Sequence, residues 1–280
     1  SFATTATPEQ ARAASKAQVR KIKKPTAEKK EEASSFSGSV ILSKNNSLYD
    51  HQDGTFYDGV GYEIDLNYKF SLGALATRVS YDQNVRNNYE DQSDFNDSPV
   101  IYSMNPFMFE GINETNMSMT PNITATIPIS KKSVKYDQLQ TSIVLGVGLG
   151  FTPKQVSPTG NFSFSFGLTA GRNLHRYEED VNGAILNQYS SNQKMSVTYT
   201  LQSYSLNVSY THKTRWSYIN TIREGFELSE ELAYEYSPAF AMAIGHTNSG
   251  AALKANGQDS NFTLVNEDDS VVYLYGAFNF

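Results

Sequence analysis

The chain has 280 residues and a formal net charge of −6, from 23 Lys and Arg against 29 Asp and Glu. This acid excess argues against a general nucleic-acid-binding protein, because such proteins carry a basic surface. The absence of cysteine excludes disulfides, thiolate metal sites and a cysteine nucleophile, and no run of 18 apolar residues predicts a transmembrane helix.

Residues 1–35 differ in composition from the rest, with eight Lys or Arg, four Asp or Glu and Phe2 as the only aromatic residue. Thr7 as N-cap and Pro8 at the first helical position favour a helix that ends before Pro25. Two interpretations stay open: a disordered tail, or a plug helix or docking arm for a partner.

From Phe36 onward, apolar and polar residues alternate with the period of two that predicts β-strands. The clearest segment is 60–71, where one face is wholly apolar and the other is small, polar or charged. The two faces are Val60, Tyr62, Ile64, Leu66, Tyr68 and Phe70 against Gly61, Glu63, Asp65, Asn67, Lys69 and Ser71.

The alternating segments are about 10 to 14 residues long, where a globular strand usually has about 5 or 6 and a tilted strand crosses a bilayer in about 9 to 11. Short turns near Leu72-Gly73, Ser203-Tyr204 and Pro238-Ala239 alternate with longer polar stretches at 45–57, 84–98, 174–192 and 250–268. This pattern is typical of membrane barrels with short periplasmic turns and long external loops.

The pattern predicts an all-β fold: a transmembrane antiparallel up-and-down β-barrel over 36–280, following a flexible extension at 1–35. About 12 strands are expected, near 36–46, 58–71, 73–84, 98–109, 116–130, 138–153, 160–174, 192–203, 205–218, 225–237, 239–249 and 268–280. Pro99 and Pro106 interrupt the fourth, so 10 or 14 strands are also compatible, and the segment from Asn105 to Glu110 could instead fold into the lumen.

The final segment, from Asp269 to Phe280, ends in phenylalanine and has apolar residues at alternate positions: Val272, Leu274, Phe278 and Phe280. Gly276 departs from this pattern. The segment resembles the C-terminal strand of bacterial outer-membrane β-barrel proteins. The resemblance implies recognition by the barrel assembly machinery, insertion into the outer membrane, and contact with its lipid and lipopolysaccharide, with the N-terminal tail in the periplasm.

If the apolar faces contact lipid, the opposite faces line the lumen. The predicted lumen-lining residues are Glu63, Asp65, Lys69, Arg78, Asp82, Lys213, Arg215, Glu227, Glu231, Glu235, Tyr273 and Tyr275. Opposed charges across a lumen orient polar solutes, but the same charges can form a static network that fills a closed barrel. Barrels near this size do either. The acid excess weakly favours cations.

Other chemistry is less well supported. The four histidines, His51, His175, His212 and His246, have no evident Ser or Asp partner in the sequence, and the phase of His212 and His246 predicts that both lie in the membrane-interface belt. Acidic loop segments at 89–94 and 267–269 lack the spacing of a calcium loop. No catalytic residue, metal site or cofactor is therefore predicted, although a barrel hydrolase is a third hypothesis. The favoured function is a narrow, porin-like channel for small polar solutes. The alternative is a structural or docking barrel that binds a periplasmic or cell-surface partner through its N-terminal tail, residues 1–35, or through its loops.

Overall fold

The computed structural model describes residues 35–48, 58–85, 93–110, 116–153, 160–253, 258–266 and 269–280. The predicted tail, residues 1–35, lies outside these ranges except for Ser35. Within them, no helix is long and apolar enough to span a membrane. The strands are β1 (Ser35–Ser47), β2 (Asp58–Phe70), β3 (Gly73–Asn84), β4 (Asp94–Asn96), β5 (Ser98–Met104), β6 (Phe107–Glu110), β7 (Asn116–Ile127), β8 (Leu139–Thr152), β9 (Asn161–His175), β10 (Asn187–Leu201), β11 (Tyr204–Ser217), β12 (Ile222–Ser237), β13 (Phe240–Ala251) and β14 (Val271–Asn279).

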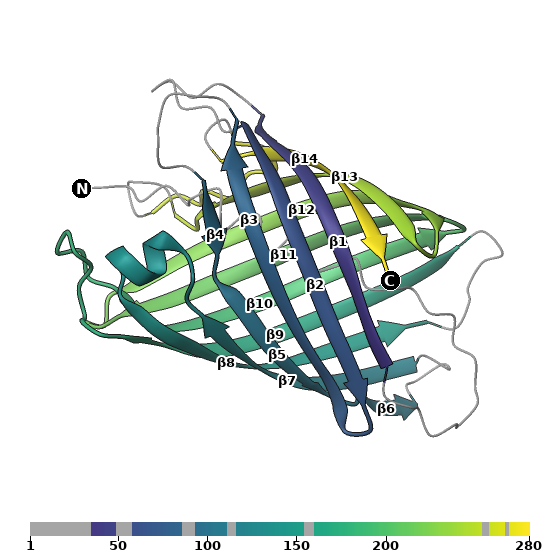
Figure 1. Ribbon diagram of the computed structural model, residues 1–280, viewed down its shortest axis with the longest axis horizontal. Coiled ribbons are helices and arrows are strands. Elements are labelled where there is room, and N and C mark those ends of the chain that lie inside the picture. The colour runs from purple at the N-terminus through teal and green to yellow at the C-terminus, as the bar shows by residue number, and fades with distance from the viewer. Residues whose placement is uncertain are drawn as a thin grey trace.

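These strands form one closed antiparallel barrel (Figure 1). The ring closes where β1 pairs with β14, from Ser39 opposite Asn279 to Ser47 opposite Val271. Short strands β4, β5 and β6 share one position between β3 and β7, so the barrel has 12 strand positions. The predicted barrel and its strand number are confirmed. Closure leaves no edge strand, which a wall in hydrocarbon requires.

The shared position is where Pro99 and Pro106 interrupted the sequence pattern. β5 ends at Met104, and after Pro106 the chain returns to the wall as β6, which pairs with β7. Proline has no N–H to donate and so breaks the ladder locally, but pairing resumes at Phe107. The alternative that the segment from Asn105 to Glu110 folds into the lumen is therefore wrong.

The two faces of the wall differ in the way that the alternation predicts. On β2, the side chains of Tyr62 and Ile64 are 44% and 47% exposed, while Glu63 between them is 2% exposed. The same contrast recurs around the ring, where large apolar side chains such as Leu145 and Leu206 remain exposed on the outside. Such an apolar outer band is what a bilayer covers.

The two ends of the barrel differ as well. Tight turns join β2 to β3, β10 to β11 and β12 to β13 at one end, where β1 also begins and β14 ends. At the other end, longer connections at 128–138, 176–186 and 252–270 join the strands, and the first of these contains the short π-helix η3 (Lys132–Tyr136). Because outer-membrane barrels have short periplasmic turns and long external loops, we call the end with tight turns the periplasmic end and the other the external end.

Asp97 holds the connection around η3 against the wall. One carboxylate oxygen accepts hydrogen bonds from the backbone N–H groups of Ile129 (3.0 Å) and Ser130 (2.9 Å). The other accepts one from the Ser133 hydroxyl. Charge-assisted hydrogen bonds of this kind are stronger than neutral ones, so Asp97 fixes the external end of the β7–β8 hairpin.

Asp137, which ends η3, gives this connection a pH dependence. Burial raises the pKa of its carboxyl group above the ordinary 3.8; Lys132 opposes the rise, and Asp180 and Asp97 add to it. Because the folded segment favours the protonated acid, its stability falls as the pH rises from the ordinary to the raised pKa. We expect Asp137→Asn to increase hydrogen-exchange protection of 128–138 at neutral pH and to leave it unchanged at pH values below 3.8. A variant that keeps the wild-type pH profile of exchange would contradict this assignment.

Part of the last external connection folds down over the outer surface. Residues 258–266, here called the outer strap, place the Phe262 ring 5.7 Å from that of Tyr210 and 5.3 Å from that of Phe226. The side-chain amide of Asn248 donates to the backbone oxygen of Thr263 over 2.6 Å. All three wall residues are in the outward phase, and Phe226 and Asn248 are buried under the strap.

Candidate functional site

Charged side chains of the inward phase gather on two parts of the ring. One group lies on β2 and β3, and the other on β10, β11 and β12. In a ring of 12 positions, β2 is directly across from β10, and β3 from β11. Figure 1 shows this arrangement, with β2 and β3 in front of β10 and β11.

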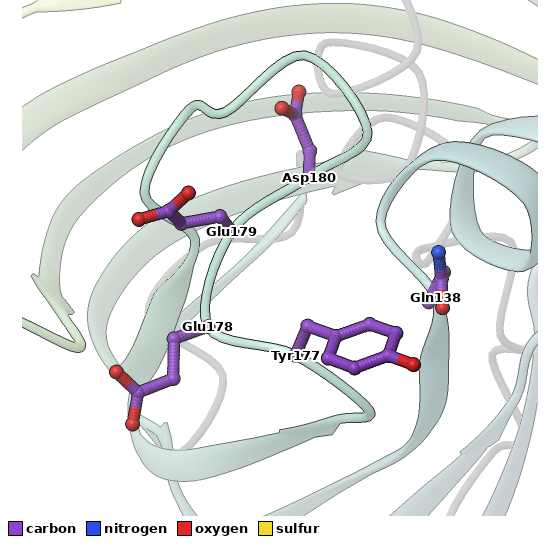
Figure 2. Close-up of a pocket in the computed structure, with 5 residues that line it drawn as sticks. All are labelled: Gln138, Tyr177, Glu178, Glu179 and Asp180. Atoms are coloured by element: carbon purple, nitrogen blue, oxygen red, sulfur yellow. The ribbon is translucent and has the colours of Figure 1, made fainter.

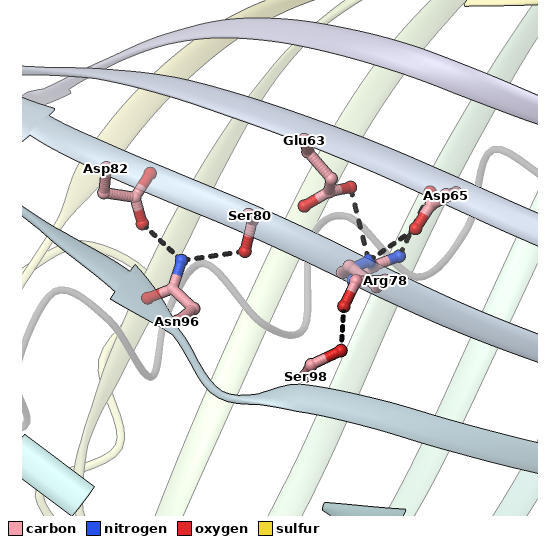
Figure 3. A network of polar contacts seen from close by, with 7 residues as sticks. All are labelled: Glu63, Asp65, Arg78, Ser80, Asp82, Asn96 and Ser98. Atoms are coloured by element: carbon pink, nitrogen blue, oxygen red, sulfur yellow. Dashed lines mark hydrogen bonds and ion pairs between the residues drawn. The ribbon is translucent and has the colours of Figure 1, made fainter. Parts of the chain in front are cut away.

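The acidic wall consists of Glu63, Asp65, Asp82 and the single base Arg78 (Figure 3). The Arg78 Nε lies 2.7 Å from an oxygen of Asp65 and 3.4 Å from one of Glu63. Asn96 donates to Asp82 over 2.7 Å and to Ser80 over 2.9 Å. Arg78 thus contacts the carboxylates of Glu63 and Asp65, while the uncharged Asn96 amide contacts that of Asp82. This leaves the wall with an excess of negative charge.

The basic wall consists of Lys194 on β10, Lys213 and Arg215 on β11, and Arg223 on β12, together with Glu227. The Lys213 ammonium lies 2.5 Å from a carboxylate oxygen of Glu227, which is 2% exposed. Lys213, Lys194 and Arg215 act electrostatically on this one carboxylate, and Arg223 adds a fourth base, so the wall carries an excess of positive charge. Across the lumen, the two walls therefore present opposite signs.

Glu231, further from the external end of β12, binds two tyrosines of β14. The Tyr273 and Tyr275 hydroxyls donate to its two oxygens over 2.8 and 3.0 Å, and all three side chains are buried. β13 lies between them, and its Gly245 is essential for this contact, because a Cβ there would overlap the Tyr273 ring. We call Glu231, Tyr273 and Tyr275 the tyrosine clamp.

The predicted lumen residues thus divide into three groups, and two further residues lie outside these groups. The structure brings Glu63, Asp65, Arg78 and Asp82 together on the acidic wall, and Lys213, Arg215 and Glu227 on the basic wall. Glu231, Tyr273 and Tyr275 form the clamp. Lys69 and Glu235 lie near the periplasmic ends of β2 and β12, where both are exposed.

Sequence reasoning missed Lys194, Arg223, Ser80 and Asn96. Lys194 shares the phase of Ser196 and Thr198 in the predicted strand at 192–203, so extending the alternation would have found it. Arg223 fell outside the predicted strand at 225–237, which begins at Ile222 in the structure. Asn96 contacts Asp82 only because β4 pairs with β3, and nothing in the local sequence indicates this pairing.

The strands between the two charged walls, β7 to β9, present small neutral residues inward. Asn122 lies opposite Gly146, and Ser165 opposite Gly150, with the Ser165 hydroxyl 2.6 Å from that of Ser196 on β10. Ser165 is exposed although it faces the inside of a closed ring. Water therefore has access to the interior on this side, which favours an open lumen over a filled one.

Two of the described histidines contact residues other than Ser or Asp. The His175 ring lies 3.3 Å from the Tyr218 hydroxyl, and the Nδ1 of His246 lies 2.8 Å from a carboxylate oxygen of Glu230. His212 and His246 are in the outward phase, as expected. His246 lies opposite Glu230 midway along β12, and its contact with that carboxylate holds the ring on the outer face of the wall; its place in the interface belt stays a prediction.

An external pocket of about 430 Å³ lies beside η3 and is lined by Gln138, Tyr177, Glu178, Glu179 and Asp180 (Figure 2). The three carboxylates point in different directions. Asp180 accepts the backbone N–H groups of Asn182 and Ala184, each over 2.8 Å, and so shapes its own turn. Among the described residues, no three His, Asp or Glu side chains are grouped to hold a metal ion.

The residues of the C-terminal pattern lie on the outside of the closing strand. Leu274, Phe278 and Phe280 are 54%, 53% and 60% exposed, and Val272 is half-buried. Phe280 exchanges two backbone hydrogen bonds with Gly38 of β1, of 2.9 and 3.0 Å. Its ring covers Gly38, whose missing side chain leaves the space. The terminal residue therefore completes the seam between the first and last strands.

Comparison with protein-family models finds no match for the chain, and comparison of its sequence with curated proteins finds none either. Solved structures do match. An outer-membrane channel from Pseudomonas putida F1 aligns with a TM-score of 0.54 and 9% identity over 91% of this chain and 100% of that one. The NanC porin aligns with a TM-score of 0.50 and 12% identity over 86% of this chain and 98% of that one. The fold is that of bacterial outer-membrane β-barrel proteins.

Proposed function

We propose that this protein is a narrow channel through the bacterial outer membrane for small polar solutes. The observation that carries the proposal is an inward face that is polar, oppositely charged on facing walls, and exposed to water at Ser165. An apolar outer face surrounds it. The channel and porin that share the fold support the same function. Because β1 starts at the end with tight turns, the proposal places residues 1–34 in the periplasm.

The facing walls also suggest how a solute is oriented. Fixed charges of opposite sign across a low-dielectric enclosure produce a field that acts on any dipole between them. A polar solute would turn its positive end toward Glu63, Asp65 and Asp82, and its negative end toward the basic wall. Simple cation preference, which the net acid excess of the sequence suggested, does not follow from this arrangement.

A cysteine placed in the lumen tests the channel directly, because the natural chain contains none. Ser165→Cys should conduct in planar bilayers like wild type, and a charged thiol reagent should then reduce each conductance step as it attaches inside the lumen. Leu145→Cys, on the outside of the neighbouring strand β8 and 60% exposed, is the matched control and should be unaffected. Correctly folded barrel that gives no conductance steps would refute the channel.

A further inference from the structure

Two arginines face each other at the external end of the basic wall. Arg215 on β11 lies directly opposite Arg223 on β12, and the register places both in the inward phase that they share with Lys213 and Glu227. Like charges directly opposite each other across a strand pair destabilise the sheet. This position would thus be unfavourable unless something negative lies between the two guanidinium groups.

No described residue supplies that negative charge through a hydrogen bond or an ion pair, and Glu227 acts on Arg215 only at longer range. Neither Arg215 nor Arg223 has a hydrogen bond or an ion pair with any residue in the described ranges, whereas Arg78 across the lumen is bonded to Asp65 and paired with Glu63. The nearest carboxylate on the basic wall, Glu227, is already bonded to Lys213. Arg215 is half-buried, so its donors are only partly available to water.

The wall positions opposite Arg215 and Lys213 on the neighbouring strands carry small, uncharged residues. Arg215 has Ser190 opposite it on β10, and Lys213, one inward position further from the external end, has Gly225 opposite it on β12. Serine and glycine are both small, and neither is charged. Lys213 and Lys194 continue the positive charge toward the middle of the barrel.

We propose that Arg215 and Arg223 form an anion-binding site at the external mouth of the lumen, for a small solute that carries a carboxylate or phosphate group. Each guanidinium offers a planar pair of donors that matches two oxygens of such a group, and a bound anion relieves the repulsion between the arginines. The inference rests on the proposed channel function, because it names the class of solute that the mouth selects.

Calorimetric titration of the purified full chain in detergent tests the site, with citrate and inorganic phosphate as two separate probes. Wild type should bind at least one of the two probes. The probe that binds with the higher affinity shows whether the site prefers a carboxylate or a phosphate group. Arg215→Gln and Arg223→Gln should each weaken binding at least about tenfold, as loss of a hydrogen bond to a charged group predicts. Arg215→Lys keeps the positive charge but loses the planar pair of guanidinium donors, so its affinity for the anion should be intermediate.

Arg176→Gln is the matched control, because it removes another external arginine, one that stacks 5.5 Å over the Tyr177 ring on the β9–β10 connection. It should bind like wild type. Absence of binding by folded wild type, or equal weakening by the control, would overturn the site. If Arg215→Gln fails to fold, Arg223→Gln decides, since Arg223 is exposed near the start of β12. Anion binding without conductance would refute the channel and leave the anion-binding site standing. Conductance without anion binding would refute the site and leave the channel standing.

Discussion

Glu231→Ala is expected to destabilise the barrel by about 3 kcal/mol, because two buried tyrosine hydroxyls lose their acceptor at once and each unsatisfied group costs about 1 to 3 kcal/mol. The Tyr273 and Tyr275 hydroxyls both donate to this carboxylate across β13. Urea unfolding of the barrel in lipid vesicles measures the change. Glu235→Ala is the control on the same strand and the same face; since Glu235 is exposed, its effect should stay within about 0.5 kcal/mol.

A triple variant separates lost hydrogen bonds from lost packing. Combining Glu231→Leu with Tyr273→Phe and Tyr275→Phe removes every polar partner of the clamp together, and such a replacement is often close to neutral. The triple variant should therefore be more stable than Glu231→Ala. If Glu231→Ala unfolds at the same urea concentration as wild type, the clamp does not stabilise the fold.

Deletion of Phe280 is expected to leave little folded barrel in the outer membrane. The deletion removes both backbone hydrogen bonds to Gly38 and the ring that covers it. Unpaired backbone groups in hydrocarbon cost several kcal/mol each, and the terminal phenylalanine is also the residue that the C-terminal resemblance assigns to the assembly machinery. The amount of heat-modifiable barrel in isolated membranes, compared with total protein, measures the effect.

Two further variants identify the cause of this loss. Gly38→Val should impair closure although Phe280 is present, because a Cβ at this position would lie 2.8 Å from the backbone oxygen of Asp65. Phe162→Ala removes an outward aromatic of similar exposure that packs on Tyr199 away from the seam, and it should insert normally. Equal losses for Phe162→Ala and the Phe280 deletion would show that any outer aromatic has this effect.

The fold could be predicted because alternation is a local property that a membrane barrel repeats in every strand. The segment at 60–71 shows the alternation in one strand: Tyr62 and Ile64 face outward, and Glu63 faces inward. Prediction left two outcomes open where prolines remove backbone donors. The strand expected at 98–109 forms as β5 and β6, but the sequence did not show that the residues after Pro106 would pair with β7 rather than fold into the lumen.

The candidate site was harder to predict because it depends on which strands face each other. Alternation placed Glu227, Lys213 and Arg215 on the inner side, but only ring closure shows that they lie across the lumen from Glu63 and Asp65. The clamp needs Gly245 on the strand that separates Glu231 from Tyr273. Sequence alone identifies this glycine as small, without showing that an aromatic ring from the next strand crosses it.

The outer strap changes what a label on this connection would report. Residues in an extracellular loop are normally accessible to antibodies and water-soluble dyes. Phe262 and Thr263 instead lie against the lateral surface of the wall, over Phe226 and Asn248. A fluorophore attached at neighbouring Leu264, which is 64% exposed, is therefore expected to report on the surroundings of the barrel's lateral surface rather than on the mouth of the lumen.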